Sequence, residues 1–165
     1  MRGLLGLVKD TIDKLEADSL LAGYMGGTTT VYTERPADSA GLPYLVLDLI
    51  DAAQFNDQSH RGTRYTIQVS AFFQRGEQGS MRGLLDVGKA CERIRDVLDD
   101  VDQYALPESP AEGESLNLDI LDGRYESNTG AAHLVLRQYT TGLITADPSG
   151  LFINGISRFV CLVSE

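Results

Sequence analysis

The chain has 165 residues, 42% of them hydrophobic, with 17 glycines and 5 prolines, which excludes a disordered, collagen-like or fibrous chain and predicts one domain over residues 1–165. The formal net charge of −10 argues against a protein that holds nucleic acid by neutralising its phosphates. Lys9 and Asp10 interrupt the apolar start of the chain, and no run approaches the roughly 20 apolar residues that span a bilayer, so we expect synthesis in a cytoplasm. Cys91 and Cys161 lie far apart in apolar stretches and are interpreted as buried hydrophobic residues, not as a disulfide or a zinc site.

The first twenty residues have the periodicity of an amphipathic helix. Apolar residues recur every three or four positions and charged residues fall between them, which gives the stripe Leu4, Val8, Ile12 and Leu15. Glycines at positions 23, 26 and 27 end this helix. A short strand is expected around residues 30–32.

Two longer strands follow, joined by a loop. Tyr44–Ile50 is apolar at nearly every position, which is typical of a strand covered on both faces. Arg64–Phe73 alternates strictly between apolar and mostly polar residues, which makes it the clearest strand of the chain. Residues 51–62 between them exceed the usual hairpin loop and carry Phe55, His60 and Arg61. A long loop with an apolar residue and a cation often contacts a partner, although an idle surface loop is an equal alternative.

The second half of the chain continues with a helix and further strands. Ser80 caps a helix that ends near Asp102 and whose apolar stripe is Leu84, Val87, Cys91, Ile94, Leu98 and Val101. Residues 106–115 are rich in Pro and Glu and indicate a loop. Residues 116–120, 133–144 and 153–163 are expected to be strands. The order of elements predicts an α+β fold, with two helices packed on one face of a mainly antiparallel β-sheet.

No catalytic or cofactor-binding motif emerges. Gly83–Ala90 nearly matches the phosphate loop G-x-x-x-x-G-K-[ST], but Ala90 lacks the hydroxyl and the segment lies within a helical period. We therefore interpret it as a helix with small residues, Gly83 and Gly88, for close packing. His60 and His133 have no ligand or nucleophile at a suitable spacing. We expect no enzyme activity, no cofactor and no metal.

Acidic residues are concentrated in one block. Residues 96–122 hold nine acids and no Lys or Arg, so the other 138 residues hold 15 acids and 14 bases. Three of these acids, Asp99, Asp100 and Asp102, stand at the expected end of the second helix, where the helix dipole disfavours negative charge. These three acids are therefore expected to serve a role other than the stability of the monomer.

Three runs carry a resemblance to a known family. Leu42–Leu47, Arg61–Phe73 and Gly88–Leu98 together resemble the tail-completion, or tail-terminator, family of long-tailed bacteriophages. The opening helix and the closing run Gly155–Val163 fit as well, so the likeness covers most of the chain. Residues 105–132 are the exception: they form an acidic, loop-rich insertion.

The resemblance implies a structural virion protein that assembles as a ring, commonly a hexamer. Such a ring sits on the last tail-tube ring at the head-proximal end, stops tube growth and gives the head–tail connector a docking face. It implies partners in the tail tube protein, the connector protein and further copies of the chain, and a location in the tail or neck of the virion. It implies no catalysis and no membrane. The alternatives are another head–tail connector or neck protein and, from a different class, a small α+β enzyme or ligand-binding domain.

Three expectations about sites follow from a ring. Residues Phe55, His60, Arg61 and Arg64 are expected at the contact with a neighbouring subunit or the tube. The strands in Arg64–Phe73 and Phe159–Val163 lack charged protection and are expected to pair between subunits as edges. The acids Asp99, Asp100, Asp102, Glu108, Glu112 and Glu114 are expected to line the channel, where they repel genome DNA and let it pass without tight binding. A solvated acidic outer surface and a docking face for a basic partner are the alternatives.

Overall fold

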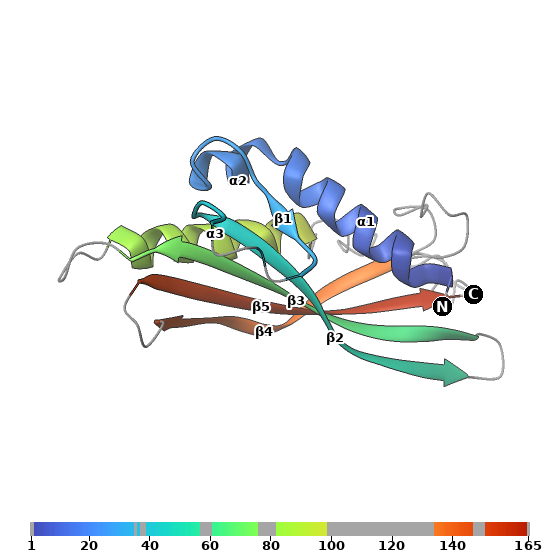
Figure 1. Cartoon of the computed structure of the whole chain (residues 1–165). Coiled ribbons are helices and arrows are strands. Elements are labelled where there is room, and N and C mark those ends of the chain that lie inside the picture. The colour runs from blue at the N-terminus through green and yellow to red at the C-terminus, as the bar shows by residue number, and fades with distance from the viewer. Residues whose placement is uncertain are drawn as a thin grey trace, which may run out of the picture.

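A computed structural model describes residues 2–34, 36, 39–56, 61–75, 82–98, 134–146 and 151–164. It contains three helices and one mixed five-stranded sheet, so the predicted α+β class is confirmed. The elements in chain order are α1 (Arg2–Ala17), α2 (Ser19–Tyr24), β1 (Val31–Tyr32), β2 (Tyr44–Asn56), β3 (Arg61–Gln74), α3 (Arg82–Leu98), β4 (Leu134–Ala146) and β5 (Phe152–Ser164). The strand order is β1-β2-β3-β5-β4, and only the β1–β2 pair is parallel. Figure 1 shows all three helices on the same face of this sheet.

The core lies between the sheet and the helices. In β3 the residues 65, 67, 69, 71 and 73 of the predicted apolar face are all buried. They meet the buried stripe of α3, Val87, Cys91, Ile94 and Leu98, all of which were predicted. Of the other two predicted members, Leu84 is 40% exposed and Val101 lies outside the described residues. The buried centre of α1 falls on Leu7, Thr11 and Leu15, while Leu4, Val8 and Ile12 pack at its margin. None of the helices in the described part of the chain could span a membrane.

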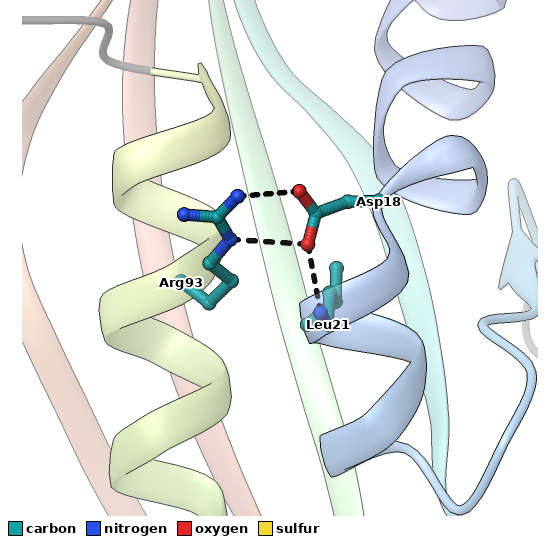
Figure 2. Close-up of polar contacts among 3 residues, drawn as sticks. All are labelled: Asp18, Leu21 and Arg93. Atoms are coloured by element: carbon teal, nitrogen blue, oxygen red, sulfur yellow. Dashed lines mark hydrogen bonds and ion pairs between the residues drawn. The ribbon is translucent and has the colours of Figure 1, made fainter.

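The predicted first helix is two helices, because Asp18 interrupts it. The backbone of Asp18 is extended, and its Oδ1 accepts a hydrogen bond of 2.7 Å from the backbone N–H of Leu21, which caps α2. The same carboxylate receives two hydrogen bonds from the Arg93 guanidinium, of 3.0 Å from Nε and 2.6 Å from a terminal nitrogen (Figure 2). One side chain therefore caps α2 and ties the turn between α1 and α2 to α3.

The environment of Asp18 favours its charged form. The hydrogen bonds from Arg93 lower the pKa of the Asp18 carboxyl below its usual 3.8, partial burial opposes this, and the N–H of Leu21 lowers the pKa further. The Asp18 hydrogen bonds in turn raise the pKa of Arg93. The pair therefore stays ionised at neutral pH.

Gly155 of β5 sets the distance between α3 and the sheet. A Cβ atom built there would lie 2.4 Å from Cys91 Sγ and 2.6 Å from Val87 Cγ1, both on α3. The interpretation of Gly88 as a close-packing residue is wrong, because a Cβ there would meet nothing within 4 Å. The close approach measured at a glycine is thus on the strand, at Gly155, while Gly83, the other glycine of that interpretation, is buried on α3.

The predicted loop over residues 51–62 is wrong in most of its length. Residues 51–56 continue β2 and residues 61–62 begin β3, with Phe55 paired to Gly62 and Asn56 to Arg61. The register shifts between Leu49 and Asp51, which marks a β-bulge. Pairing with β3 carries the strand through residues whose own β-propensity is low, so the sequence of 51–56 alone gives little sign of it.

Candidate assembly interface

One face of the sheet, the open face, points away from the helices. Register and alternating burial place on it Tyr32, Tyr44, Val46, Asp48, Thr66, Gln68, Ser70, Phe72, Phe152, Asn154, Ile156, Arg158 and Val160. Among the described residues, none of these belongs to the hydrophobic core cluster. In the described structure the helices cover only one face of Tyr44–Ile50 (Figure 1); on the other face Val46 is 7% exposed, and Tyr44 and Asp48 are half-buried. This second face mixes apolar and polar side chains.

An aromatic row crosses four strands of the open face. The ring centroids lie 5.6 Å apart for Tyr32 and Tyr44, 5.2 Å for Tyr44 and Phe72, and 5.5 Å for Phe72 and Phe152. Each of the four side chains is half-buried, so the rings shield one another at their edges. Edge-to-face and tilted pairs of this kind stabilise a sheet by about 0.5–1.5 kcal/mol each beyond the area they bury. The row therefore forms an aromatic strip across β1, β2, β3 and β5.

A polar row runs beside the aromatic one. Arg158 Nε donates a hydrogen bond of 2.9 Å to Gln68 Oε1, and Gln68 Nε2 donates one of 3.1 Å to Ser70 Oγ. The strand register places Asp48 opposite Gln68. Asn154 Oδ1 is buried and has no hydrogen-bond partner in the described part of the chain. The hydrogen-bonded Arg158 and the unpaired Asn154 oxygen thus lie beside an apolar row. Interfaces between proteins commonly combine an apolar centre with polar groups that give specificity.

Exposed apolar residues also mark the bulge in β2. Leu49 is 45% exposed and Ile50 is 48% exposed. The two-residue β1 pairs only with Leu45 and Val46, so beyond these positions β2 has β3 as its one strand neighbour in the described structure. An apolar pair on an unpaired strand edge is a feature that monomeric proteins avoid.

The predicted contact residues fall on the β2–β3 hairpin or outside the described residues. Phe55 and Arg61 lie on paired strands close to the hairpin tip, and the backbone of Arg64, whose side chain is exposed, pairs with Ala53 and Leu162. His60 lies outside the described residues. In Figure 1 this hairpin extends past the first turn of α1 at the N-terminus.

The predicted edge strands are wrong. Both β3, which contains Arg64–Phe73, and β5, which contains Phe159–Val163, have a strand on each side. The outer strands are β1 with the exposed part of β2, and β4. Strand order depends on pairings far apart in sequence, so alternation within a strand does not reveal whether it is central.

The predicted channel acids Asp99, Asp100, Asp102, Glu108, Glu112 and Glu114 all lie outside the described residues, as do the expected strand 116–120 and the insertion 105–132. Asp96 of the same block lies on α3, where its Oδ1 is 3.0 Å from a guanidinium nitrogen of Arg95. Both of these side chains are half exposed, so this pair contributes little to stability.

The residues considered for chemistry are placed as follows. Gly83–Ala90 lies within the first turns of α3, so the segment is helical and does not form the loop between a strand and a helix that a phosphate loop requires. Cys91 and Cys161 are buried, as predicted, and neither forms a disulfide; burial raises the pKa of the Cys91 thiol. Across the described ranges, no three His, Cys, Asp or Glu side chains gather as metal ligands would.

The open face and the Asp18–Arg93 pair were both missed by sequence reasoning. An available signal was the apolar run Tyr44–Ile50 beside the alternating Arg64–Phe73, whose second face includes Phe72. Asp18 at a break in helical periodicity was a capping signal, but its partner lies 75 residues away.

Comparison with known proteins identifies a similar fold. No protein-family model and no curated protein matches the chain. A chain in the solved structure of the virion of a native gene transfer agent (GTA) particle matches it with a TM-score of 0.60 and 18% sequence identity. The match covers 94% of this chain and 92% of that one. The protein therefore shares its fold, over nearly the whole length of both chains, with a component of that virion structure.

Proposed function

We propose that this protein is a structural component of a phage-like virion that forms a ring at the head-proximal end of a tail tube. In that place it ends tube growth and offers the head–tail connector a docking face. The observation that carries the proposal is the match of fold over 94% of the chain with a chain of a gene transfer agent virion. The resemblance of Leu42–Leu47, Arg61–Phe73 and Gly88–Leu98 to tail terminators supports the specific role.

The surface of the protein suits assembly better than catalysis. The open face presents an aromatic row and fixed polar groups, and the hairpin and two sheet edges offer further contacts. A ring needs two different surfaces on each subunit, because only head-to-tail contacts close into a cycle of more than two copies. These surfaces meet that requirement, and the role uses no catalytic group, cofactor or metal.

Native mass spectrometry of the purified protein, followed by electron microscopy with tail tubes of its own virion, tests the role. We expect a ring, a hexamer being the most compatible with the resemblance, that caps tubes of regulated length. A chain that stays monomeric at micromolar concentration and is absent from assembled tails would contradict the proposal.

The hairpin carries our first mutational prediction. Phe55 serves as the apolar anchor of the contact with a neighbouring subunit or the tube, and Arg61 pairs with a carboxylate there, while His60 and Arg64 flank them. Anchors of this type contribute about 2 kcal/mol or more each to an interface. The double variant Phe55→Ala/Arg61→Ala should keep the circular dichroism and melting temperature of the wild type but lose ring or tail assembly. Glu92→Ala, at an exposed position of α3, is the control. Normal tail length and yield from the double variant would refute this assignment.

The second mutational prediction concerns the acidic block of residues 96–122. Its carboxylates face the channel and keep genome DNA from binding the channel wall, since cations there would release counterions and hold phosphates. The residues concerned are Asp99, Asp100, Asp102, Glu108, Glu112 and Glu114. Six copies at −10 carry −60, nearly all of it from this block. Replacing the three aspartates with lysine should leave assembly intact and slow DNA ejection, measured by dye release from triggered particles. Failed head–tail joining would indicate that the acidic block is a docking face for a basic partner. Normal assembly with normal ejection would indicate that the block lies on the solvated outer surface.

A further inference from the structure

The two outer edges of the sheet are unlike each other. On one side, residues Leu47 to Asn56 of β2 pair only with β3 among the described residues, because β1 ends at Tyr32, which pairs with Val46. On the other side β4 has β5 as its one strand neighbour in the described structure. Within the described ranges, each edge therefore presents a row of backbone N–H and C=O groups that no neighbouring strand pairs.

The charges on the two edge strands are complementary. Residues 47–56 of β2 contain two acids, Asp48 and Asp51, and no base. The 13 residues of β4 contain one base, Arg137, and no acid. Two β2 edges placed side by side would bring acids together, whereas β2 beside β4 brings opposite charges together.

The strand directions also match. β2 is antiparallel to β3, β3 to β5, and β5 to β4, so β4 runs opposite to β2. A copy rotated about an axis along the strands would bring its β4 against the β2 of the first copy in an antiparallel arrangement. The alternation of the sheet would then continue across the boundary, and each copy would use both edges once.

We propose that β4 of one copy pairs antiparallel with residues 47–56 of β2 of the next, so that a continuous β-sheet runs around the ring. The exposed Leu49 and Ile50 lie at this junction and become covered by the neighbouring strand. This inference rests on the proposed ring and adds which elements join its subunits. It also explains why an apolar pair is tolerated on a strand edge, since the edge does not remain free.

Hydrogen exchange on the wild-type protein tests the pairing without any substitution. Amide exchange is followed by mass spectrometry for peptides covering residues 47–56 and 134–146, at concentrations below and above the one at which rings form. In the ring both segments should exchange about tenfold or more slowly, while α3 should exchange as in the free protein. A ring in which these two segments exchange as fast as in the free chain overturns the pairing and leaves the ring itself standing. Absence of any ring overturns the proposed function, and the pairing with it.

Charge exchange between the strands gives an independent test. Asp51→Lys alone and Arg137→Glu alone each place like charges at the junction, and each should weaken ring formation about fivefold or more at low salt. An equimolar mixture of the two variants should restore rings that contain both chains in equal number, because alternating copies make every junction complementary again. Glu92→Lys and Arg95→Glu make the same charge changes on α3, where both side chains are exposed, and should assemble normally. Rescue cannot come from a misfolded chain, and failure of the mixture while both variants keep the wild-type melting temperature overturns the proposal. If only Asp51→Lys lost ring formation and the mixture did not restore it, β2 would contact another surface. That result would also overturn the proposed pairing of β2 with β4.

Discussion

Replacing Gly155 with alanine is expected to lower the free energy of unfolding by about 2–3 kcal/mol. The new methyl group would lie at 2.4 and 2.6 Å from Cys91 Sγ and Val87 Cγ1, where no real Cβ contact occurs. Both neighbours belong to buried side chains of α3, so these side chains must leave their packed rotamers or the helix must shift away from β5. Urea denaturation followed by circular dichroism measures the change.

Gly88→Ala is the matched control for Gly155→Ala. It adds the same methyl group on α3, at a position where a Cβ meets nothing within 4 Å, and removes a glycine from the interior of a helix. Its expected effect is therefore stabilisation, by up to about 1 kcal/mol. If both substitutions changed stability in the same direction, the close approach of α3 to Gly155 could not be the cause.

Substitution of Asp18 has the second largest expected effect. Asp18→Ala removes the cap of α2, which is worth about 1 kcal/mol. It also removes the bidentate contact with Arg93, which is worth only about 1 kcal/mol more because Arg93 is partly exposed. Asp18→Asn keeps a capping oxygen and loses the charge, so it should cost about half as much as alanine. A double-mutant cycle with Arg93→Ala isolates the pair; a coupling energy near zero would show that the cap alone matters.

The same pair predicts a pH dependence. The pKa of Asp18 is lower in the folded protein than its usual 3.8, so the folded state binds this proton less readily than the unfolded state does. The stabilisation that ionised Asp18 contributes is fully present about one pH unit or more above 3.8. It is lost as the pH falls through the pKa of the folded state. The stability difference between wild type and Asp18→Asn should therefore shrink on acidification below about pH 5. A difference that stays constant down to the acid transition would contradict the linkage.

Local patterns predicted the fold well where local physics dominates. The alternation of Arg64–Phe73 and the stripe of α3 each correspond to an observed buried face, because side-chain direction follows from helix and strand geometry alone. The split at Asp18 and the strand over residues 51–56 were missed, because one depends on a cap and the other on pairing with β3.

The candidate interface was much less accessible to sequence reasoning. Phe55 and Arg61 lie on paired strands where the sequence predicts a loop, and β3 and β5, which the sequence predicts as edges, are central. Apolar character alone does not say whether a residue faces the core or another chain. That distinction needs the positions of the helices, which in the described structure lie on one face of the sheet alone (Figure 1).

By itself the sequence determined the α+β class, the placement of most helices and strands, the buried thiols and the concentration of acid in residues 96–122. Only the tertiary structure decided the strand order, the open face with its aromatic row, the Asp18–Arg93 contact and the close approach at Gly155. The physical reason is the range of the interactions. Periodicity and capping act between residues a few positions apart, whereas pairing of strands and packing of helices join residues such as 18 and 93, which no local pattern connects.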